Sequence, residues 1–316
     1  MKAAVVEKYG PADVLHIKEV EQPRIKPDFI LVRNHAASIN PIDFKVRRGD
    51  LKVITGFRKP RVGILGYDVA GEVLETGEKV TGFSKGDQIY AHISVKHGGA
   101  NAEYVAVPAQ AASLKPANLS FEEAAAVPLA ALTAMQALRD KGNIGPGEQV
   151  LINGASGGVG VFAVQIAKAF GAAVTAVCGP KNTELVQSLG ADAVIDYTKE
   201  DFTKSNESFD IIFDVVANKS FPACKQALKP DGIYITTIPT PAIIASILLS
   251  SLLPGKKARS VMVKSSGKDL QILKELIEDE KVQVVIDRTF PLSQIAEAHR
   301  YSEAGHTRGK NVLIIS

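Results

Sequence analysis

The chain has 316 residues, of which 46% are hydrophobic and 22% charged, values typical of a folded globular protein and not of a disordered one. Its 37 basic and 34 acidic side chains leave a net charge of +3, too small an excess to indicate a nucleic-acid partner. Two cysteines, Cys178 and Cys224, are too few for a disulfide framework, and the amino terminus meets a charged residue too early for a signal peptide. We therefore expect a cytoplasmic protein.

Residues 1–121 consist of short β-type runs separated by glycine, proline and aspartate turns, which predicts an irregular, mostly antiparallel β domain. The runs are Ile30–His35, Val69–Leu74, Asp87–Ala91 and Glu103–Val107. Residues 265–316 return to this style, and the last run, Val312–Ile315, is suited to pair back into the first domain. We therefore expect one domain formed by residues 1–121 and 265–316, with a second domain, residues 122–264, inserted into it.

The inserted part begins at Ser120-Phe121-Glu122-Glu123, a capping-box-like start to an alanine-rich helix. From there helical segments alternate with apolar runs, and such near-continuous apolar runs are typical of parallel strands covered on both faces. This alternation predicts a doubly wound α/β domain, a Rossmann fold with a parallel sheet. The predicted strands are Gln149–Asn153, Val174–Cys178, Ala193–Asp196, Phe209–Val216, Gly232–Thr237 and Ser260–Lys264, with helices near Val161–Phe170, Asn182–Leu189, Phe221–Leu228 and Leu270–Glu278.

A loop of small residues, Gly154–Gly160, joins the first of these strands to the helix that follows it. A strand, a glycine loop and a helix in this order can bind a pyrophosphate, because glycines allow a tight turn and the N–H groups at the helix start face the anion. In the G-x-G-x-x-G register, Ala155 takes the place of the first glycine, followed by Gly157 and Gly160. A glycine loop is often only a turn, but its position here favours a dinucleotide site.

The end of the second predicted strand indicates which dinucleotide is bound. It reads Cys178-Gly179-Pro180-Lys181-Asn182, without the carboxylate that would hold the ribose 2′-hydroxyl of NAD. Lys181 would attract a 2′-phosphate, although it could also be a solvated residue at a helix start. Tyr197, which closes the third strand, is either a neighbour of the adenine-ribose end or a half-buried aromatic. The pattern favours NADPH.

The run Ala242–Leu253 contains no charged residue but is too short to span a bilayer, which takes roughly 20 residues. Its length favours a buried helix in the core, in a pocket wall or in a subunit contact. The following Pro254-Gly255-Lys256-Lys257 leaves contact with a membrane surface as the alternative.

Several motifs, spread over almost the whole chain, carry a family resemblance. They are Asn40–Lys45, Gly66–Val73, Gly98–Pro108, Val127–Ala134, Gly154–Gly160, Ser188–Tyr197 and Arg308–Lys310. With them the chain resembles the zinc-independent medium-chain dehydrogenase/reductase family, in particular its quinone oxidoreductase (zeta-crystallin-like) and alkenal/enone reductase branch. The resemblance implies a Rossmann domain inserted in a GroES-like, mostly β catalytic domain. It also implies a homodimer in which Ser260–Lys264 pairs across the two subunits.

The sequence lacks the zinc ligands of related alcohol dehydrogenases, which carry a cysteine near Asn40, Gly-His-Glu in place of Gly66-Tyr67-Asp68, and often a four-cysteine lobe. The six histidines show no motif spacing with cysteine, so we expect no metal. Without a Lewis acid, substrates that are already electrophilic at carbon are favoured. Quinones and α,β-unsaturated carbonyls fit, because hydrogen bonds can hold the oxyanion that develops on them.

The resemblance also implies roles for individual residues. Asn40, Asp43 and Lys45 are expected at the catalytic cleft, with Lys45 reaching cofactor phosphate, ribose or substrate oxygen; the alternative for Asp43 and Lys45 is a surface pair beside a turn. No tyrosine follows in Val46–Gly49, so water is the expected proton donor, and Arg47 and Arg48 either face solvent or recognise an acidic substrate. The residues expected to bind NADPH are Lys45, Thr133, Ser156, Gly157, Gly158, Val159, Gly179, Pro180, Lys181, Asn182, Tyr197, Ile235, His306, Thr307 and Arg308.

Together these features predict a zinc-free, NADPH-dependent oxidoreductase that reduces enones, alkenals or quinones by direct hydride transfer. Two alternatives belong to other classes. One is a catalytically weak NADPH-binding or crystallin-like structural protein, since a protein can keep its nucleotide-binding loop after it has lost catalytic activity. The other is a reductase of oxidised lipids at a membrane surface, which depends only on the Ala242–Leu253 run.

Overall fold

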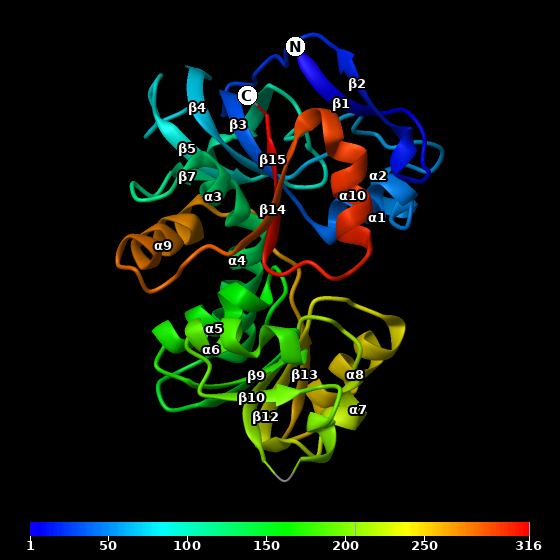
Figure 1. Cartoon of the computed structure of the whole chain (residues 1–316), viewed down its shortest axis with the longest axis vertical. Helices are drawn as coiled ribbons and strands as arrows, with labels where there is room; N and C mark the ends of the chain where they lie inside the picture. Colours follow the sequence, from blue (N-terminus) through cyan, green and yellow to red (C-terminus); the bar gives the residue numbers. More distant parts are fainter. Residues whose placement is uncertain (206, 316) are drawn as a thin grey trace. The chain divides into compact units, whose positions relative to one another are not determined.

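A computed structural model describes residues 1–205 and 207–315 of the chain (Figure 1). These residues form two compact units. The first contains Met1–Leu132, Lys264–Asp279 and the chain from Val284 onward, and the second contains Thr133–Val263 and Glu280–Gln283.

The first unit is built on a mostly antiparallel sheet. Its strand order is β14 (Ile286–Pro291), β15 (Lys310–Ile314), β3 (Phe29–Ile39), β4 (Asp68–Thr76), β5 (Gln88–His92) and β7 (Ala112–Leu114), with β6 (Tyr104–Pro108) also paired to β3. A separate hairpin joins β1 (Lys2–Val6) to β2 (Leu15–Glu19). The last strand, β15, runs antiparallel to β3 with Asn311 opposite Ile39, which confirms the predicted return of the carboxyl-terminal run to the first domain.

The helices of the first unit begin where their sequences supply caps. In α1 (Pro41–Arg48), Asn40 is the N-cap, proline follows it, and the Asp43 carboxylate accepts the Asn40 backbone N–H at 2.7 Å. In α3 (Phe121–Ala126), the predicted capping box is present, with the Ser120 N–H bonded to the Glu123 carboxylate at 2.8 Å. The unit also contains α2 (Lys52–Thr55), α9 (Gly267–Glu278) and α10 (Ile295–Glu303), and short 3₁₀ turns at Ala12–Val14, Ala109–Ala111 and Leu292–Gln294.

The edges of the compact units differ from the predicted boundaries at residues 121/122 and 264/265. Residues up to Leu132 lie in the first unit because α3 packs against β3 and β4, and because the Leu129 N–H donates to Asp68 Oδ1 at 2.9 Å. The helix α4 (Pro128–Met135) crosses this boundary. At the other edge, Gln283 belongs to the second unit because its N–H and C=O both bond to the Gln165 side-chain amide, at 2.7 and 3.0 Å.

The second unit has the predicted doubly wound fold. Its six strands are all parallel, in the order β10 (Ala193–Asp196), β9 (Ala173–Cys178), β8 (Gln149–Asn153), β11 (Phe209–Asp214), β12 (Leu228–Thr236) and β13 (Lys257–Ser260). Counted along the chain, this is the 3-2-1-4-5-6 order of dinucleotide-binding domains. Its helical segments are η3 (Gln136–Gly142, a π-helix), α5 (Gly160–Ala169), η4 (Pro180–Asn182), α6 (Thr183–Ser188), η5 (Phe202–Lys204), α7 (Phe221–Cys224) and α8 (Pro241–Leu252).

Two elements of this unit differ from their predicted ranges. The sixth strand is β13, Lys257–Ser260, and not Ser260–Lys264, because its only neighbour, β12, ends at Thr236 opposite Ser260. A single further bond, from the Val261 N–H to the Thr236 carbonyl at 3.0 Å, continues the ladder. The helix predicted over Phe221–Leu228 is the shorter α7, and Leu228 already starts β12.

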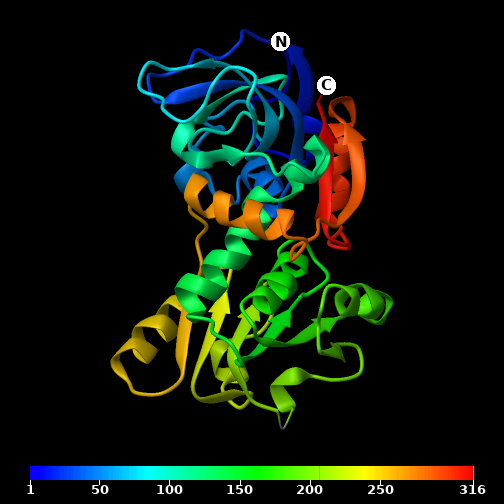
Figure 2. The ribbon, with the colours of Figure 1, turned by 90° about the vertical axis from the view of Figure 1, so that its left-hand side faces the viewer.

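The uncharged run Ala242–Leu253 forms α8, which packs beside β13 at the edge of the second sheet (Figure 2). The expectation that this run is a buried core helix is wrong, because Ile243 and Ser250 are its only buried residues. Leu248 is 62% exposed and Leu252 is 83% exposed, and Ile244, Leu249 and Leu253 extend the same apolar surface. In the part of the chain that the structure describes, no helix is long and apolar enough to cross a membrane.

Candidate active site

The glycine loop of the second unit makes a tight turn between β8 and α5. Gly154 has a φ of +88°, and its carbonyl accepts the Gly157 N–H at 3.1 Å. A Cβ on Gly160 would lie 2.7 Å from the Ala155 backbone and closer still to the Gly154 carbonyl oxygen, so only glycine fits there. Between these positions Ser156, Gly157, Gly158 and Val159 are partly exposed at the start of α5. The loop therefore has the close backbone packing and the free surface that a pyrophosphate site requires.

The residues predicted to bind the 2′-phosphate lie together at the carboxyl end of β9. The Asn182 side-chain amide donates to Ser156 Oγ at 3.1 Å, which links this end to the glycine loop. Tyr197 is 65% exposed, and a Cβ on Gly179 would lie 3.3 Å from its hydroxyl oxygen, so the ring borders Gly179. Pro180 and Lys181 are exposed on η4.

No carboxylate occupies this end of β9 within residues 178–183. The nearest acid on the neighbouring strand is Asp196, at the end of β10, where its Oδ1 accepts the backbone N–H and the hydroxyl of Thr198 at 3.0 and 2.7 Å. The site thus presents an ammonium group and a phenol ring to a ligand.

A polar network between β8 and β11 was missed by the reasoning from sequence. Asn153 Nδ2 donates to Asp214 Oδ1 and to Asn218 Oδ1, both at 2.8 Å, and the Tyr234 hydroxyl donates to Asp214 Oδ2 at 3.0 Å. The two strands meet where the strand order reverses, which is where doubly wound sheets bind ligands. The sequence did contain a signal for this network, because the apolar strands β8 and β11 end in the polar residues Asn153 and Asp214.

Two residues predicted to contact the cofactor from this unit are buried. Thr133 on α4 is almost completely buried. Ile235 on β12 is completely buried, and a Cβ on Gly142 of η3 would lie 3.4 Å from its Cδ1. The Ile235 side chain packs under η3, and Ile238 is an exposed residue beyond the end of the strand, so a contact between Ile235 and the cofactor stays a prediction.

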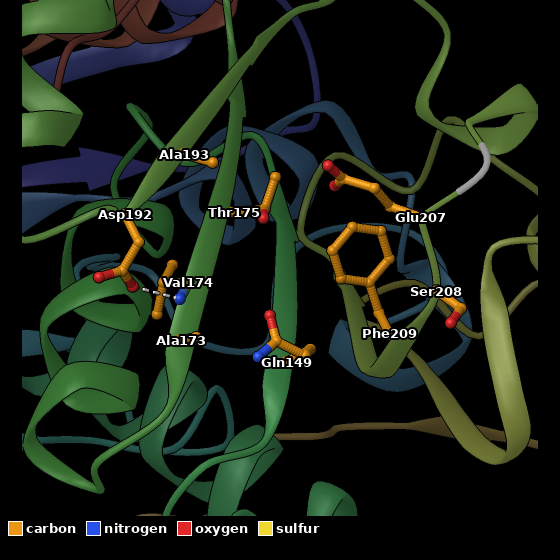
Figure 3. Close-up of a pocket in the computed structure, with 9 residues that line it drawn as sticks. All are labelled: Gln149, Ala173, Val174, Thr175, Asp192, Ala193, Glu207, Ser208 and Phe209. Atoms are coloured by element: carbon orange, nitrogen blue, oxygen red, sulfur yellow. Dashed lines mark hydrogen bonds between the residues drawn. The ribbon is translucent and has the colours of Figure 1, made fainter.

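A shallow pocket lies at the opposite edge of the same sheet (Figure 3). Asp192 is one of its lining residues and accepts the Val174 N–H at 2.7 Å, as drawn in Figure 3. Its lining comes from the amino ends of strands β8 to β11, so it does not belong to the glycine-loop site at the carboxyl ends. The lining residues are Gln149, Ala173, Val174, Thr175, Asp192, Ala193, Glu207, Ser208 and Phe209.

In the first unit, two of the three predicted catalytic residues are buried and hydrogen-bonded to neighbouring residues. Asn40 is buried, and its Nδ2 donates to Asp68 Oδ2 at 2.8 Å and to Ser38 Oγ at 3.3 Å, while its Oδ1 accepts from Lys310 Nζ. Asp43 is completely buried as the capping partner of Asn40, which excludes the surface pair with Lys45. Lys45, two residues after Asp43 in α1, is the partly exposed member of the three.

Asp68 is the centre of this buried cluster. Its Oδ1 accepts from the Leu129 N–H at 2.9 Å and from His92 Nδ1 at 3.3 Å, and its Oδ2 accepts from Ser38 Oγ at 2.7 Å and from Asn40. Burial acts to raise the pKa of Asp68, but the hydrogen bond from His92 and the positive charge of Lys310 hold it below its usual value.

The other two charged groups of the cluster have pKa values shifted by burial. For Asp43, burial and the negative charge of Asp68 raise the pKa to about 7, against the opposing effects of the Asn40 N–H and Lys310. For Lys310, burial lowers the pKa, and the charges of Asp68 and Asp43 oppose this change. Burial and the neighbouring charges therefore shift all three pKa values, raising that of Asp43 and lowering those of Asp68 and Lys310.

Arg47 neither faces solvent nor is available for an acidic substrate, so both expectations for it are wrong. Its guanidinium is completely buried and donates from Nη2 to Glu303 on α10, which ties α1 to α10. Arg48 is exposed, with Asp50 at 3.5 Å.

The segment His306-Thr307-Arg308 precedes β15 in the first unit. His306 and Arg308 are exposed, and the Thr307 hydroxyl accepts from the Asn311 amide at 2.9 Å. This segment presents an imidazole and a guanidinium at the surface.

Comparison with known proteins decides the family. Residues 26–117 match a family described as alcohol dehydrogenase GroES-like domain, and residues 189–313 match one described as zinc-binding dehydrogenase. A 2-methylene-furan-3-one reductase from Solanum lycopersicum is 38% identical over 99% of this chain and 79% of its own length. The chain belongs to the medium-chain dehydrogenase/reductase family.

Two further members of this family are similar over the whole chain. A chloroplastic NADPH-dependent alkenal/one oxidoreductase from Arabidopsis thaliana is 36% identical over 99% of this chain and 79% of its own length. The structure of the quinone oxidoreductase from Coxiella burnetii is 33% identical with a TM-score of 0.90, covering 100% of this chain and 99% of that chain. Both lie in the branch that the sequence motifs indicated.

The zinc in one family description does not fit the residues of this medium-chain reductase. Within residues 1–205 and 207–315, no group of three histidine, cysteine, aspartate or glutamate side chains is arranged to hold a metal ion. Where zinc alcohol dehydrogenases carry cysteine and Gly-His-Glu, this chain places Asn40, Tyr67 and Asp68, and the Lys310 ammonium group is bonded to Asn40. An amide bonded to an ammonium group is not a zinc donor set.

Proposed function

We propose that this protein is an NADPH-dependent reductase of α,β-unsaturated carbonyl compounds and quinones, acting by hydride transfer to carbon. The observation that carries the proposal is the carboxyl end of β9, which offers Lys181 and Tyr197 and no carboxylate within residues 178–183, beside a glycine loop with room for a pyrophosphate. The names of the relatives, an alkenal/one oxidoreductase and a 2-methylene-furan-3-one reductase, support the substrate class.

The residues present fit NADPH. The Ser156–Val159 backbone would hold the pyrophosphate, and Lys181 with Tyr197 would hold the 2′-phosphate end. When bound, NADPH supplies the hydride. Lys45, the partly exposed ammonium on α1, would hold the negative charge that develops on the substrate oxygen, and water would supply the proton.

The test measures NADPH oxidation with p-quinones and with enones of matched size, with NADH as the control cofactor. We expect turnover of at least one class, a preference for NADPH that is lost in Lys181→Ala, and a lower rate in Lys45→Ala. No turnover across a broad panel of both classes would refute the proposal. Tight NADPH binding without turnover, with no effect of Lys45→Ala on any rate, would favour the structural NADPH-binding alternative.

We also propose that the protein is a homodimer that covers the apolar face of α8. Among the residues that the structure describes, β13 is an edge strand of its sheet. It is continuous with α8, because Ser250 Oγ accepts the Ala258 N–H at 3.0 Å and Lys257 Nζ donates to the Ser250 carbonyl at 2.8 Å. Sedimentation should show a dimer that Leu248→Ser with Leu252→Ser dissociates. A monomer that co-sediments with anionic vesicles through the same two leucines would favour the membrane-surface alternative instead.

A further inference from the structure

Lys310 is a buried lysine whose position is fixed by the backbone around it. It begins β15, and its N–H donates to the Val285 carbonyl at 2.9 Å. The preceding Gly309 has a φ of +78°, and a Cβ there would lie 2.8 Å from Val285 Cγ1, so this turn requires glycine. Because β15 is paired with β3, whose end leads into Asn40, the side chain is only 3% exposed and reaches the N-cap of α1.

The amide of Asn40 lies between a cation and an anion. Its Oδ1 accepts from the Lys310 ammonium, and its Nδ2 donates to the Asp68 carboxylate at 2.8 Å. A flipped amide would place NH₂ against the ammonium and a carbonyl oxygen against the carboxylate. Both charged groups therefore fix the same orientation of Asn40, and Asn40 is the residue at which α1 begins.

The cluster includes sequence positions at which related zinc alcohol dehydrogenases carry ligand motifs. In this chain the positions of their ligand motifs are Asn40, Tyr67 and Asp68, and the Tyr67 hydroxyl has no hydrogen-bond partner among the described residues. Lys310 is the lysine that bonds to this cluster, and His92 Nδ1 lies 3.3 Å from Asp68 Oδ1 on its other side. A lysine ammonium offers three donors and no coordination site, so it can orient acceptors but cannot polarise a substrate as a metal does.

We infer that Lys310 is the built-in cation of this cluster, which replaces a metal as its anchor and positions Asn40 and, through it, α1 with Lys45. Lys310 is thus a positioning residue. Its effect on catalysis rests on the proposed function, whereas the anchoring of α1 does not.

The experiment separates charge balance from positioning by comparing Lys310→Met, the double variant Lys310→Met with Asp68→Asn, and Lys79→Met as an exposed-lysine control. The readouts are Tm, amide hydrogen exchange of α1 and kcat. Lys310→Met removes a buried positive charge that stabilises the Asp68 carboxylate, so Tm should fall by roughly 10 °C. Exchange in α1 should rise at least about ten-fold and kcat should fall by a similar factor, while NADPH binding changes less than about three-fold. The control should match the natural protein in all of these.

The double variant decides between the two roles. It removes the cation and the anion together, so it should recover at least half of the lost Tm while α1 exchange stays fast and kcat stays low. If α1 exchange and kcat recover together with Tm, Lys310 only balances charge and the inference is wrong. If the natural protein turns over no enone or quinone, the proposed function fails, but exchange and Tm still test the anchoring of α1.

Two further measurements complete the test. Should Lys310→Met not fold, Lys310→Arg keeps the charge but not the compact ammonium, and it should show the fast α1 exchange with a smaller loss of Tm. The natural protein, incubated with zinc and desalted, should retain less than about 0.1 zinc ion per chain. Retention of one zinc per chain that is abolished by Asp68→Asn would overturn the replacement of the metal by Lys310.

Discussion

Replacing Asp43 by asparagine should remove a pH-dependent loss of stability from the first unit. The carboxyl is completely buried, and burial together with the charge of Asp68 raises its pKa from 3.8 to about 7. In the unfolded chain the same carboxyl has its ordinary pKa, so the folded state favours the protonated form. Its contribution to stability is therefore fully present below about pH 4 and is lost as pH rises through 7.

The magnitude follows from the difference between the two pKa values. A carboxyl whose pKa moves from 3.8 to about 7 loses on the order of 4 kcal/mol between strongly acidic and alkaline pH. About 2.5 kcal/mol of this loss falls between pH 5 and pH 8. Asparagine has nearly the same shape, and its side-chain oxygen can still accept the Asn40 N–H, so the helix cap survives the change.

The assay is urea unfolding of the natural protein and of Asp43→Asn at several values between pH 5 and pH 8. The chain has no tryptophan and 7 tyrosines, of which Tyr9, Tyr67, Tyr90, Tyr104 and Tyr301 lie in the first unit, so tyrosine fluorescence reports mainly on that unit. The stability of Asp43→Asn relative to the natural protein should rise by about 2.5 kcal/mol over this range, and Asp28→Asn, an exposed position, serves as the control. A difference that stays constant with pH would refute the reasoning, because Asp43 would then keep one protonation state.

Three other substitutions have outcomes that the structure specifies. Gly160→Ala would place a Cβ 2.7 Å from the Ala155 backbone, so NADPH affinity measured by fluorescence titration should fall at least about ten-fold. Gly145→Ala is the control and should leave this affinity unchanged, because a Cβ at Gly145 meets open space. Lys181→Ala should weaken NADPH binding about five-fold in the same titration and leave NADH binding unchanged, since a contact between exposed charges contributes about 1 kcal/mol. Arg47→Met should lower the unfolding free energy by about 3 kcal/mol, because the partly buried carboxylate of Glu303 on α10 loses its cation; a loss below about 1 kcal/mol would contradict a stabilising ion pair between α1 and α10.

The parallel sheet could be predicted from sequence because its strands are buried on both faces. Gln149–Asn153 and Ala193–Asp196 are found at their predicted bounds, and the glycine loop lies between a strand and a helix as expected. The strand β13 was misplaced because it reads Lys257-Ala258-Arg259-Ser260, with a single buried apolar residue. Its identity comes from its partner β12, and a local pattern does not contain that partner.

The helix α8 shows a different limit. Its composition predicts a helix correctly, since Thr240 caps it and Pro241 begins it. The sequence cannot show which faces of that helix the neighbouring elements cover. A run without charges is typical of a buried helix in most folds, but α8 lies at the edge of a sheet, where only one face meets the rest of the chain. The exposed leucines are therefore a property of topology and not of composition.

The candidate catalytic residues show that the absence of zinc ligands in the sequence does not reveal which residues occupy that part of the structure. The sequence shows that the ligands of a zinc site are absent near Asn40, but Lys310, which bonds to Asn40, lies 270 residues further along the chain. That pairing arises only because β15 returns to β3 and carries a buried ammonium to the start of α1. Asn40 and Asp43 then act as the anchored cap of a helix, and Lys45, the partly exposed member of the three, is the residue that we propose meets the substrate. A zinc-free site of this kind contains a buried lysine bonded to the cap of α1, and we propose that its chemistry depends on how firmly Lys310 holds that helix.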